Sequence, residues 1–588
     1  MIKPMSRVIG AARQADRFFK DGLPPAEVEQ CRRSNPQLMK RLILAFVLWS
    51  GFAPGFATAA AALTNKVLII GIDGTMPGAL ALARTPNLDA LKSNGCHSVR
   101  VVTHPVTHSA ACWSSMFTGV WGDKHAVNDP GNSFAGNQFS NYPSFFQRLE
   151  AANSNLNTLA FARWAPMLTA VPDADVKLSF DSDAAVTDET CRRLTNSNPD
   201  VFWMLLLDVD SAGHASGWGP TVSNYVRAIE IADGRVGQII GALTNRVTYS
   251  NENWLVIVQT DHGEHDHPDP ERSRIVFSIY QGPAAARGVI WPAPAIVDVC
   301  ATVLTHMGVP IQPAWNLDAR VAGLPMPPAR YGTNLIFNGD AESISGTNNY
   351  TPNRGIAWWF DLASTTLGAY GANANFPTLA SPGPTNRGAK FFLGGTTNAS
   401  LLQRINVSDL AADVDGSGVD YALSGWFGGA GAQEDWASLT ASFLNAAGAV
   451  LGSNVVGLVT AAERGGVTGL LLRSTNGPLP GGTRFVEFTL TNRVVTGMND
   501  ASADNLSFIL TPRPLPPFFI TAYGPATNGW QVQFTSTTNR LYVLERSENL
   551  ATWIEITPPW PGTGQASVPV DTNAPSGQAF YRIGCRLP

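Results

Sequence analysis

The chain has 588 residues, more than one hydrophobic core usually serves, so several domains are expected. A net charge of −5 and the lack of a basic run with interleaved aromatic residues argue against electrostatic nucleic-acid binding. All 9 histidines lie at or before His306, so titratable chemistry is expected in the first half of the chain.

Residues 1–60 are predicted to be a leader. The segment from Met39 to about Ala59 starts with two cations, continues through an apolar run and ends in small residues, as secretory signal peptides do. A glycine and a proline break the run, which is too short for a transmembrane span. We therefore expect a secreted, periplasmic or cell-surface protein, with a retained N-terminal anchor as the alternative.

Residues 64–325 have the pattern of an α/β domain. Continuous apolar runs such as KVLIIGID, VFWMLLLDVD and NWLVIVQTD alternate with helical stretches such as YVRAIEIADGRVGQIIGALTN. Apolar strands separated by helices indicate a mostly parallel sheet that is covered on both faces.

The rest of the chain is rich in short β-like runs separated by glycine, asparagine, serine and proline. This pattern predicts a β-sandwich over residues 333–512. The proline-rich PRPLPP is typical of a stiff spacer, and a second, smaller β-sandwich is expected over residues 517–588.

Carboxylates and imidazoles follow three of the apolar runs, and the residues concerned are Asp73, Asp208, Asp210, His214, Asp261 and His262. Since ligands of open α/β sheets bind at the carboxyl ends of the strands, these acids could converge at one edge. Oxygen and imidazole donors suit zinc, manganese or a similar divalent metal, and two Asp/His pairs indicate two ions. A thiolate zinc site is excluded because no CxxC motif occurs. The TDHGEHDH stretch supplies one more imidazole, from His265 or His267.

Ser109 is the candidate nucleophile. It stands at the expected start of a helix, where the helix dipole favours an anion and a metal could lower the pKa of the hydroxyl. The competing interpretation is that Ser109 only caps the helix, which is the commoner role of a serine there.

Five motifs make residues 64–325 similar to the type I phosphodiesterase and nucleotide pyrophosphatase family of the alkaline phosphatase superfamily. In chain order they are KVLIIGIDG, HSAACWSSMFTGVWGDKHAV, VDSAGHASGWGP, TDHG and IVDVCATVLTHMGVP. The resemblance implies an alkaline-phosphatase-like fold, two zinc ions, and a phosphoester substrate such as a nucleotide or a lipid head group. It also implies in-line displacement at phosphorus through a phosphoenzyme, followed by attack of water.

The resemblance also divides the ligands between the two metals. One ion would be bound by Asp73, Ser109, Asp261 and His262, and the other by Asp210, His214 and a downstream histidine. Family members usually have that histidine in a His-Gly pair, whereas this chain has His-Asp-His. Both His265 and His267 therefore remain candidates, with a slight preference for His267.

Two other functions are alternatives. One is a sulfatase or phosphonate hydrolase of the same superfamily, although SAACW lacks the proline and arginine of the sulfatase motif. The other is a surface-binding protein with an inactive hydrolase domain, against which the complete set of candidate ligands argues.

The β-rich regions resemble attachment modules. The region from NLIFNGDAE to DNLSFIL is similar to jelly-roll carbohydrate-binding modules, and the last unit resembles fibronectin or immunoglobulin-like repeats. The resemblance implies attachment to glycans or to a cell surface. Four tryptophans are candidates for stacking on sugars, with core packing as the favoured interpretation: Trp358, Trp359, Trp426 and Trp436.

Overall fold

The computed structural model describes residues 63–325, 331–343, 348–350, 356–363, 365–416, 418–513, 518–538 and 540–586. The predicted leader lies outside these residues. All helices and strands within them belong to one compact unit, Thr64–Pro588. None of the helices in the described ranges combines the length and the apolar character needed to cross a membrane.

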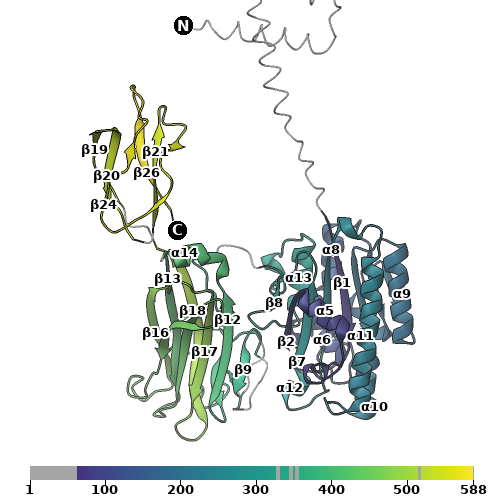
Figure 1. Cartoon of the computed structure of the whole chain (residues 1–588). Helices are drawn as coiled ribbons and strands as arrows, with labels where there is room; N and C mark the ends of the chain where they lie inside the picture. Colours follow the sequence, from purple (N-terminus) through teal and green to yellow (C-terminus); the bar gives the residue numbers. More distant parts are fainter. Residues whose placement is uncertain are drawn as a thin grey trace, which may run out of the picture. The chain divides into compact units, whose positions relative to one another are not determined.

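An eight-stranded sheet forms the centre of the first domain (Figure 1). In spatial order its strands are β4 (Val176–Ser179), β3 (Thr158–Ala162), β5 (Val201–Leu206), β1 (Thr64–Ile72), β6 (Glu252–Gln259), β7 (Ile275–Gln281), β2 (Gly95–Val102) and β8 (Gly288–Val289). Neighbouring strands are parallel except for β7, which runs antiparallel to both β6 and β2. The predicted mostly parallel sheet is confirmed.

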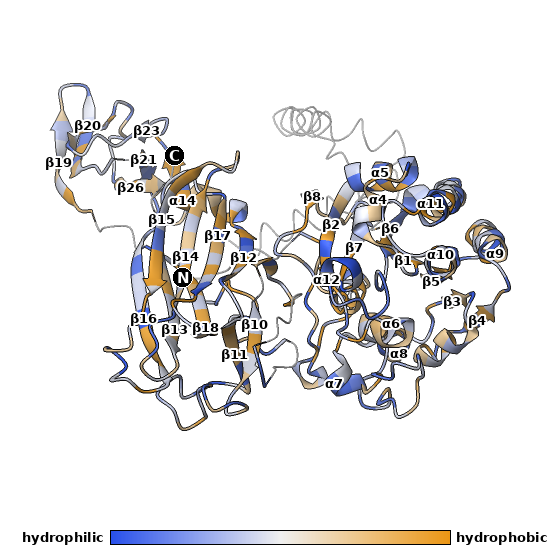
Figure 2. Ribbon diagram, turned by 90° about the horizontal axis from the view of Figure 1, so that it is seen from below, coloured by the Kyte–Doolittle hydropathy of each residue, from blue (hydrophilic) through white to orange (hydrophobic). Residues whose placement is uncertain are grey.

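Helices cover both faces of this sheet because its central strands are apolar on both sides. Val67 and Ile69 of β1 pack into one core cluster, while Leu68 and Ile70 pack into another on the opposite face. The first face is covered by α6 (Ser109–Thr118), α8 (Phe145–Ala152) and α13 (Asp298–His306), and the second by α5 (Pro86–Ser93), α9 (Asp183–Asn196) and α11 (Ser223–Thr244). Figure 2 shows α6 and α8 on one side of β1 and β6, with α5 and α11 on the other.

Shorter helices lie in the connections. They are α4 (Pro77–Leu80), α7 (Gly122–His125), η1 (Ala165–Ala170), α10 (Asp208–Ser216), η2 (Tyr249–Asn251), α12 (Pro270–Ser273) and η3 (Pro313–Trp315). Of these, α10 directly follows β5 and carries candidate site residues.

Antiparallel sheets follow in the next part of the chain, as predicted. One five-stranded sheet has the order β10 (Thr366–Ala369), β11 (Lys390–Gly395), β18 (Asn499–Pro512), β13 (Val419–Gly429) and β16 (Gly469–Pro478). The other has the order β15 (Val450–Gly457), β14 (Trp436–Leu444), β17 (Phe485–Arg493), β12 (Ala399–Asn406) and β9 (Phe360–Ala363), with η4 (Ser408–Leu410) and α14 (Ala411–Asp415) after β12. Buried residues alternate with less buried ones along β12 and β17, as expected of strands with one face in a core.

Two small antiparallel sheets form the last part of the described chain. The first contains β19 (Ile520–Ala526), β20 (Gly529–Thr535), β24 (Ala566–Ser567) and β25 (Val570–Asp571). The second contains β22 (Ile554–Glu555), β21 (Leu541–Ser547), β23 (Trp560–Pro561) and β26 (Phe580–Arg586).

Candidate functional site

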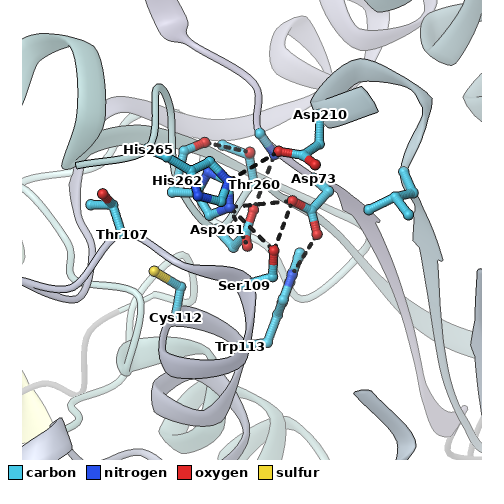
Figure 3. Close-up of polar contacts among 12 residues, drawn as sticks. Asp73, Thr107, Ser109, Cys112, Trp113, Asp210, Thr260, Asp261, His262 and His265 are labelled. Carbon is cyan, nitrogen blue, oxygen red and sulfur yellow. Dashed lines mark hydrogen bonds and ion pairs between the residues drawn. The ribbon is translucent and has the colours of Figure 1, made fainter. Parts of the chain in front are cut away.

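The candidate residues gather where three adjacent parallel strands end. Asp73 follows β1, Asp210 lies in α10 directly after β5, and Asp261 and His262 follow β6. The spatial order β5-β1-β6 brings the carboxyl ends of these strands to one edge of the sheet. Figure 3 shows their side chains converging there.

Asp73, Asp261 and His262 form a group whose ligand atoms lie within 4.8 Å of one another, and all three residues are buried. The His262 Nε2 atom lies 3.4 Å from Asp73 Oδ1 and 3.4 Å from Asp261 Oδ2. Its Nδ1 atom lies 2.9 Å from the Gly263 carbonyl oxygen and must donate to it. That bond leaves Nε2 unprotonated and directed into the group, as a metal-binding imidazole requires.

Ser109 lies against this group. Its Oγ atom is 3.3 Å from Asp73 Oδ1 and 3.2 Å from His262 Nε2 (Figure 3). Ser109 is the first residue of α6, and the N-cap position before it belongs to His108. The hydroxyl therefore faces carboxylate and imidazole groups rather than capping a backbone N–H.

The carboxylates of this group fit a divalent cation. Asp261 Oδ1 accepts from Gly74 N, whereas Asp261 Oδ2 is buried with no hydrogen-bond partner among the described residues. Burial and the charge of Asp210 raise the pKa of Asp73 to about 8, and burial and the charge of Asp73 raise the pKa of Asp261. A bound cation would lower both pKa values again because it favours the ionised carboxylates.

A second group consists of Asp210, His262 and His265. His265 Nε2 lies 3.3 Å from Asp210 Oδ1, and His214 Nε2 lies 3.6 Å from Asp210 Oδ2. The His214 side chain is 55% exposed. It lies next to Asp210 but does not belong to the group of Asp210, His262 and His265. Burial raises the pKa of Asp210, but the hydrogen bond with His265 and the neighbouring histidines outweigh burial and leave that pKa below its usual value.

The structure distinguishes the two alternative histidines. His265 contacts both Asp210 and the His262 ring, whose centroid lies 4.2 Å from its own. His267 instead accepts a hydrogen bond from Asp269 N through Nδ1 and belongs to neither group. Of the two candidates, the geometry therefore favours His265 over the slightly preferred His267, and the turn that separates them contains Asp266, whose φ is +47°.

Close packing holds the two groups side by side. Gly74 has a φ of +64°, and a Cβ there would lie 2.8 Å from Asp210 Oδ1, so no larger residue fits between the strand ends. Behind the imidazoles, the ring of Trp218 lies 5.6 Å from that of His214 and 5.8 Å from that of His265. Both contacts restrict where the histidines can point.

Several residues at the site were not predicted. Trp113 Nε1 donates to Asp73 Oδ2 over 3.1 Å, and Asn132 Oδ1 accepts from Ala110 N over 2.7 Å at the start of α6. Trp113 stands four residues after Ser109, so helical spacing could have placed it on the same face of α6 as Ser109. Asn132 follows a turn-like NDPG stretch and carries no comparable signal.

A second unpredicted contact joins residues 107–108, directly before Ser109, to Asp266 in the loop after β6. The His108 Nε2 atom lies 2.8 Å from Asp266 Oδ2, and Asp266 N donates to Thr107 Oγ1 over 2.9 Å. The His108 ring also meets the edge of the His265 ring, with the centroids 4.8 Å apart. These contacts fix His265 relative to Ser109.

Residues 67–158 match the model of the family described as "Type I phosphodiesterase / nucleotide pyrophosphatase". The match lies in the first part of the α/β domain. The matched segment contains Asp73 and Ser109, whereas the other candidate ligands of the phosphodiesterase-like domain come later in the chain. The expected resemblance is confirmed.

A comparison with curated protein sequences gives no match. Among solved structures, the murine ectonucleotide pyrophosphatase/phosphodiesterase 5 is 14% identical, with 42% of this chain and 96% of that chain covered and a TM-score of 0.33. A putative sulfatase from Bacteroides thetaiotaomicron is 11% identical, with 44% and 73% covered and a TM-score of 0.36. A phosphonate monoester hydrolase from Silicibacter pomeroyi is 15% identical, with 44% and 76% covered and a TM-score of 0.33. These values are too low to indicate a shared substrate.

Proposed function

We propose that the phosphodiesterase-like domain is a metal-dependent phosphodiester hydrolase in which Ser109 is the nucleophile. The observation that carries this proposal is the position of Ser109 Oγ, 3.3 Å from Asp73 Oδ1 and 3.2 Å from His262 Nε2 at the first turn of α6. A buried hydroxyl between a carboxylate and an imidazole has the surroundings of an activated nucleophile.

Two divalent ions would complete the site, and zinc is the ion we favour for these oxygen and nitrogen donors. Asp73, Asp261 and His262 would hold the ion next to Ser109, and Asp210 and His265, with His214 at the border, would hold the other. When bound, such ions lower the pKa of a coordinated hydroxyl and neutralise charge on phosphoryl oxygens.

Residues of the protein would carry out the attack on phosphorus and stabilise the phosphoryl group. Ser109 would lose its hydroxyl proton and attack phosphorus in line with the leaving alkoxide, which departs with its bonding electrons and is protonated to the alcohol. The covalent Ser109 intermediate would keep the second ester group of the substrate. A water would then attack the same phosphorus, break its bond to Ser109 Oγ and release a phosphomonoester, and Oγ would regain a proton. The N-terminal end of α6 favours the negative charge of the phosphoryl group. The Asn132 amide, held at Ala110 N, would offer its Nδ2 to a phosphoryl oxygen at the same helix end.

The proposal also covers where the enzyme acts, on which class of substrate, and how it is attached. The leader-like segment supports action outside the cytoplasm, on a phosphoester such as a nucleotide or a lipid head group. The β-rich modules would attach the enzyme to a glycan or a cell surface.

A metal-depletion assay on the full chain tests this function. A chelator should abolish hydrolysis of an aryl phosphodiester and zinc should restore it, because the ligands must be paired with cations to act. Phosphomonoester and sulfate ester substrates are assayed in parallel. Chelator-resistant hydrolysis would contradict the metal requirement, and faster turnover of the sulfate ester would favour a sulfatase.

A further inference from the structure

The two ligand groups meet at the turn after β1. The first group is Asp73, Asp261 and His262, and the second is Asp210, His262 and His265. Gly74 follows Asp73 in this turn, and a Cβ on Gly74 would lie 2.9 Å from the Asp210 Cα atom. The backbone of the turn therefore packs directly on α10, and its position sets the separation of the two groups.

Residues that follow β6 hold one side of this turn. Gly74 N donates to Asp261 Oδ1 over 3.1 Å, and Thr75 N donates to Thr260 Oγ1 over 2.9 Å. These bonds fix the turn relative to the end of β6, where the other two ligands of the first group stand.

Tyr225 of α11 holds the same turn from the helical layer. Its hydroxyl donates to the Gly74 carbonyl oxygen over 2.5 Å and accepts from Met76 N over 2.9 Å. The Tyr225 side chain is fully buried, and both partner residues are buried as well. Without this hydroxyl, a buried carbonyl and a buried N–H would each lose a hydrogen-bond partner, which a protein interior tolerates poorly.

The Tyr225 ring also connects the turn to the second group, through Trp218. The ring centroids of these two residues are 5.4 Å apart. The Trp218 ring lies 5.6 Å from that of His214 and 5.8 Å from that of His265. A Cβ on Gly213 would lie 2.6 Å from the Trp218 ring, so the indole packs directly against α10 beside His214. One aromatic pair therefore reaches both groups.

We propose that Tyr225 and Trp218 are positioning residues that set the spacing of the two metal sites. Tyr225 holds Asp73 and Asp261 through the backbone of the turn, and Trp218 restricts the His214 and His265 rings. Both residues act through the ligands and not on the ion. The inference rests on the metal sites of the proposed function, but it does not depend on which ester the enzyme cleaves.

Calorimetric zinc titration of the metal-free full chain tests the proposal. Asp261→Asn and His265→Ala are titrated first, to show which binding step belongs to the first group and which to the second. Tyr225→Phe removes only the hydroxyl and should weaken the step of the first group about ten-fold or more, because the turn loses two hydrogen bonds. Trp218→Ala should weaken the step of the second group by a similar factor, and Trp218→Phe should restore much of that affinity because it keeps a ring.

Tyr249→Phe is the matched control for loss of a tyrosine hydroxyl. Tyr249 is partly buried against the same core cluster, and within the described ranges no hydrogen bond or ring contact joins it to either ligand group. Its variant should bind zinc like the wild type. Circular dichroism at the titration temperature shows that each variant is folded.

The proposal is overturned if the wild type binds no zinc, if a folded Tyr225→Phe or Trp218→Ala protein binds both ions as tightly as the wild type, or if Tyr249→Phe weakens binding equally. Selective weakening in a chain that hydrolyses no phosphodiester would support the spacing role and contradict the proposed function.

Discussion

At Ser109 the hydroxyl could either cap a helix or carry out chemistry, and the position of the residue before it argues against the capping role. His108 holds the extended N-cap conformation, with φ −120° and ψ 144°, so Ser109 is already helical. Its hydroxyl contacts Asp73 and His262 instead of a backbone N–H. Local sequence could not decide this, because both interpretations place a serine at the start of a helix.

Asp73 gives a prediction about pH and stability in the metal-free protein. Its folded pKa of about 8 lies above the ordinary 3.8, so the folded chain keeps a proton that the unfolded chain has lost between these values. Stability should therefore fall as the pH rises from about 4 to about 8, by on the order of a few kcal/mol. Thermal unfolding of chelator-treated protein at pH 5, 6.5 and 8 measures this decline.

Asp73→Asn is the matched variant for that measurement. The amide does not ionise, so the metal-free variant should lose less stability over the same pH range than the wild type. An equally steep decline in both proteins would contradict the assigned pKa of Asp73.

At the scale of elements, the loop after β6 shows what sequence could and could not predict. Apolar runs that end in Asp73, Asp210 and Asp261 predict parallel strands whose carboxyl ends meet, and the structure brings these residues together. The choice between His265 and His267 depended instead on backbone geometry at Asp266, where φ is +47°. No periodicity in the sequence encodes a single left-handed residue.

The contacts of Asp266 predict that it positions His265. Asp266→Ala removes the contact with His108 Nε2 and should weaken metal binding by about ten- to a hundred-fold, as loss of a supporting residue around a metal site does. Calorimetric zinc titration of the metal-free full chain measures this change directly.

His267→Ala is the control in the same loop. Because His267 belongs to neither candidate group, this variant should bind zinc like the wild type. Equal zinc affinity in Asp266→Ala and wild type, or a loss confined to His267→Ala, would contradict the assignment of His265.

At the scale of the whole molecule, the change in residue pattern along the chain predicted that a mostly parallel α/β sheet is followed by antiparallel sheets. Long apolar runs became the central strands of the eight-stranded sheet, and the short β-like runs after residue 333 became antiparallel strands. The pattern could not predict that β7 runs antiparallel between β6 and β2, since a strand buried on both faces looks alike in either direction. Nor could composition separate Trp426 from Trp359, because the difference depends on packing: Trp426 lies in β13 and is partly buried, whereas Trp359 lies in the bend before β9 and packs into the core.

The central claim is that Ser109 is the nucleophile of a metal-dependent phosphodiester hydrolase. The most direct test measures hydrolysis of an aryl phosphodiester and bound zinc in Ser109→Ala, with Ser109→Thr as the control that keeps a hydroxyl. We predict that Ser109→Ala retains its zinc but loses rate by about 10³-fold or more, while Ser109→Thr keeps measurable activity. A folded, zinc-loaded Ser109→Ala protein with a near wild-type rate would contradict the claim.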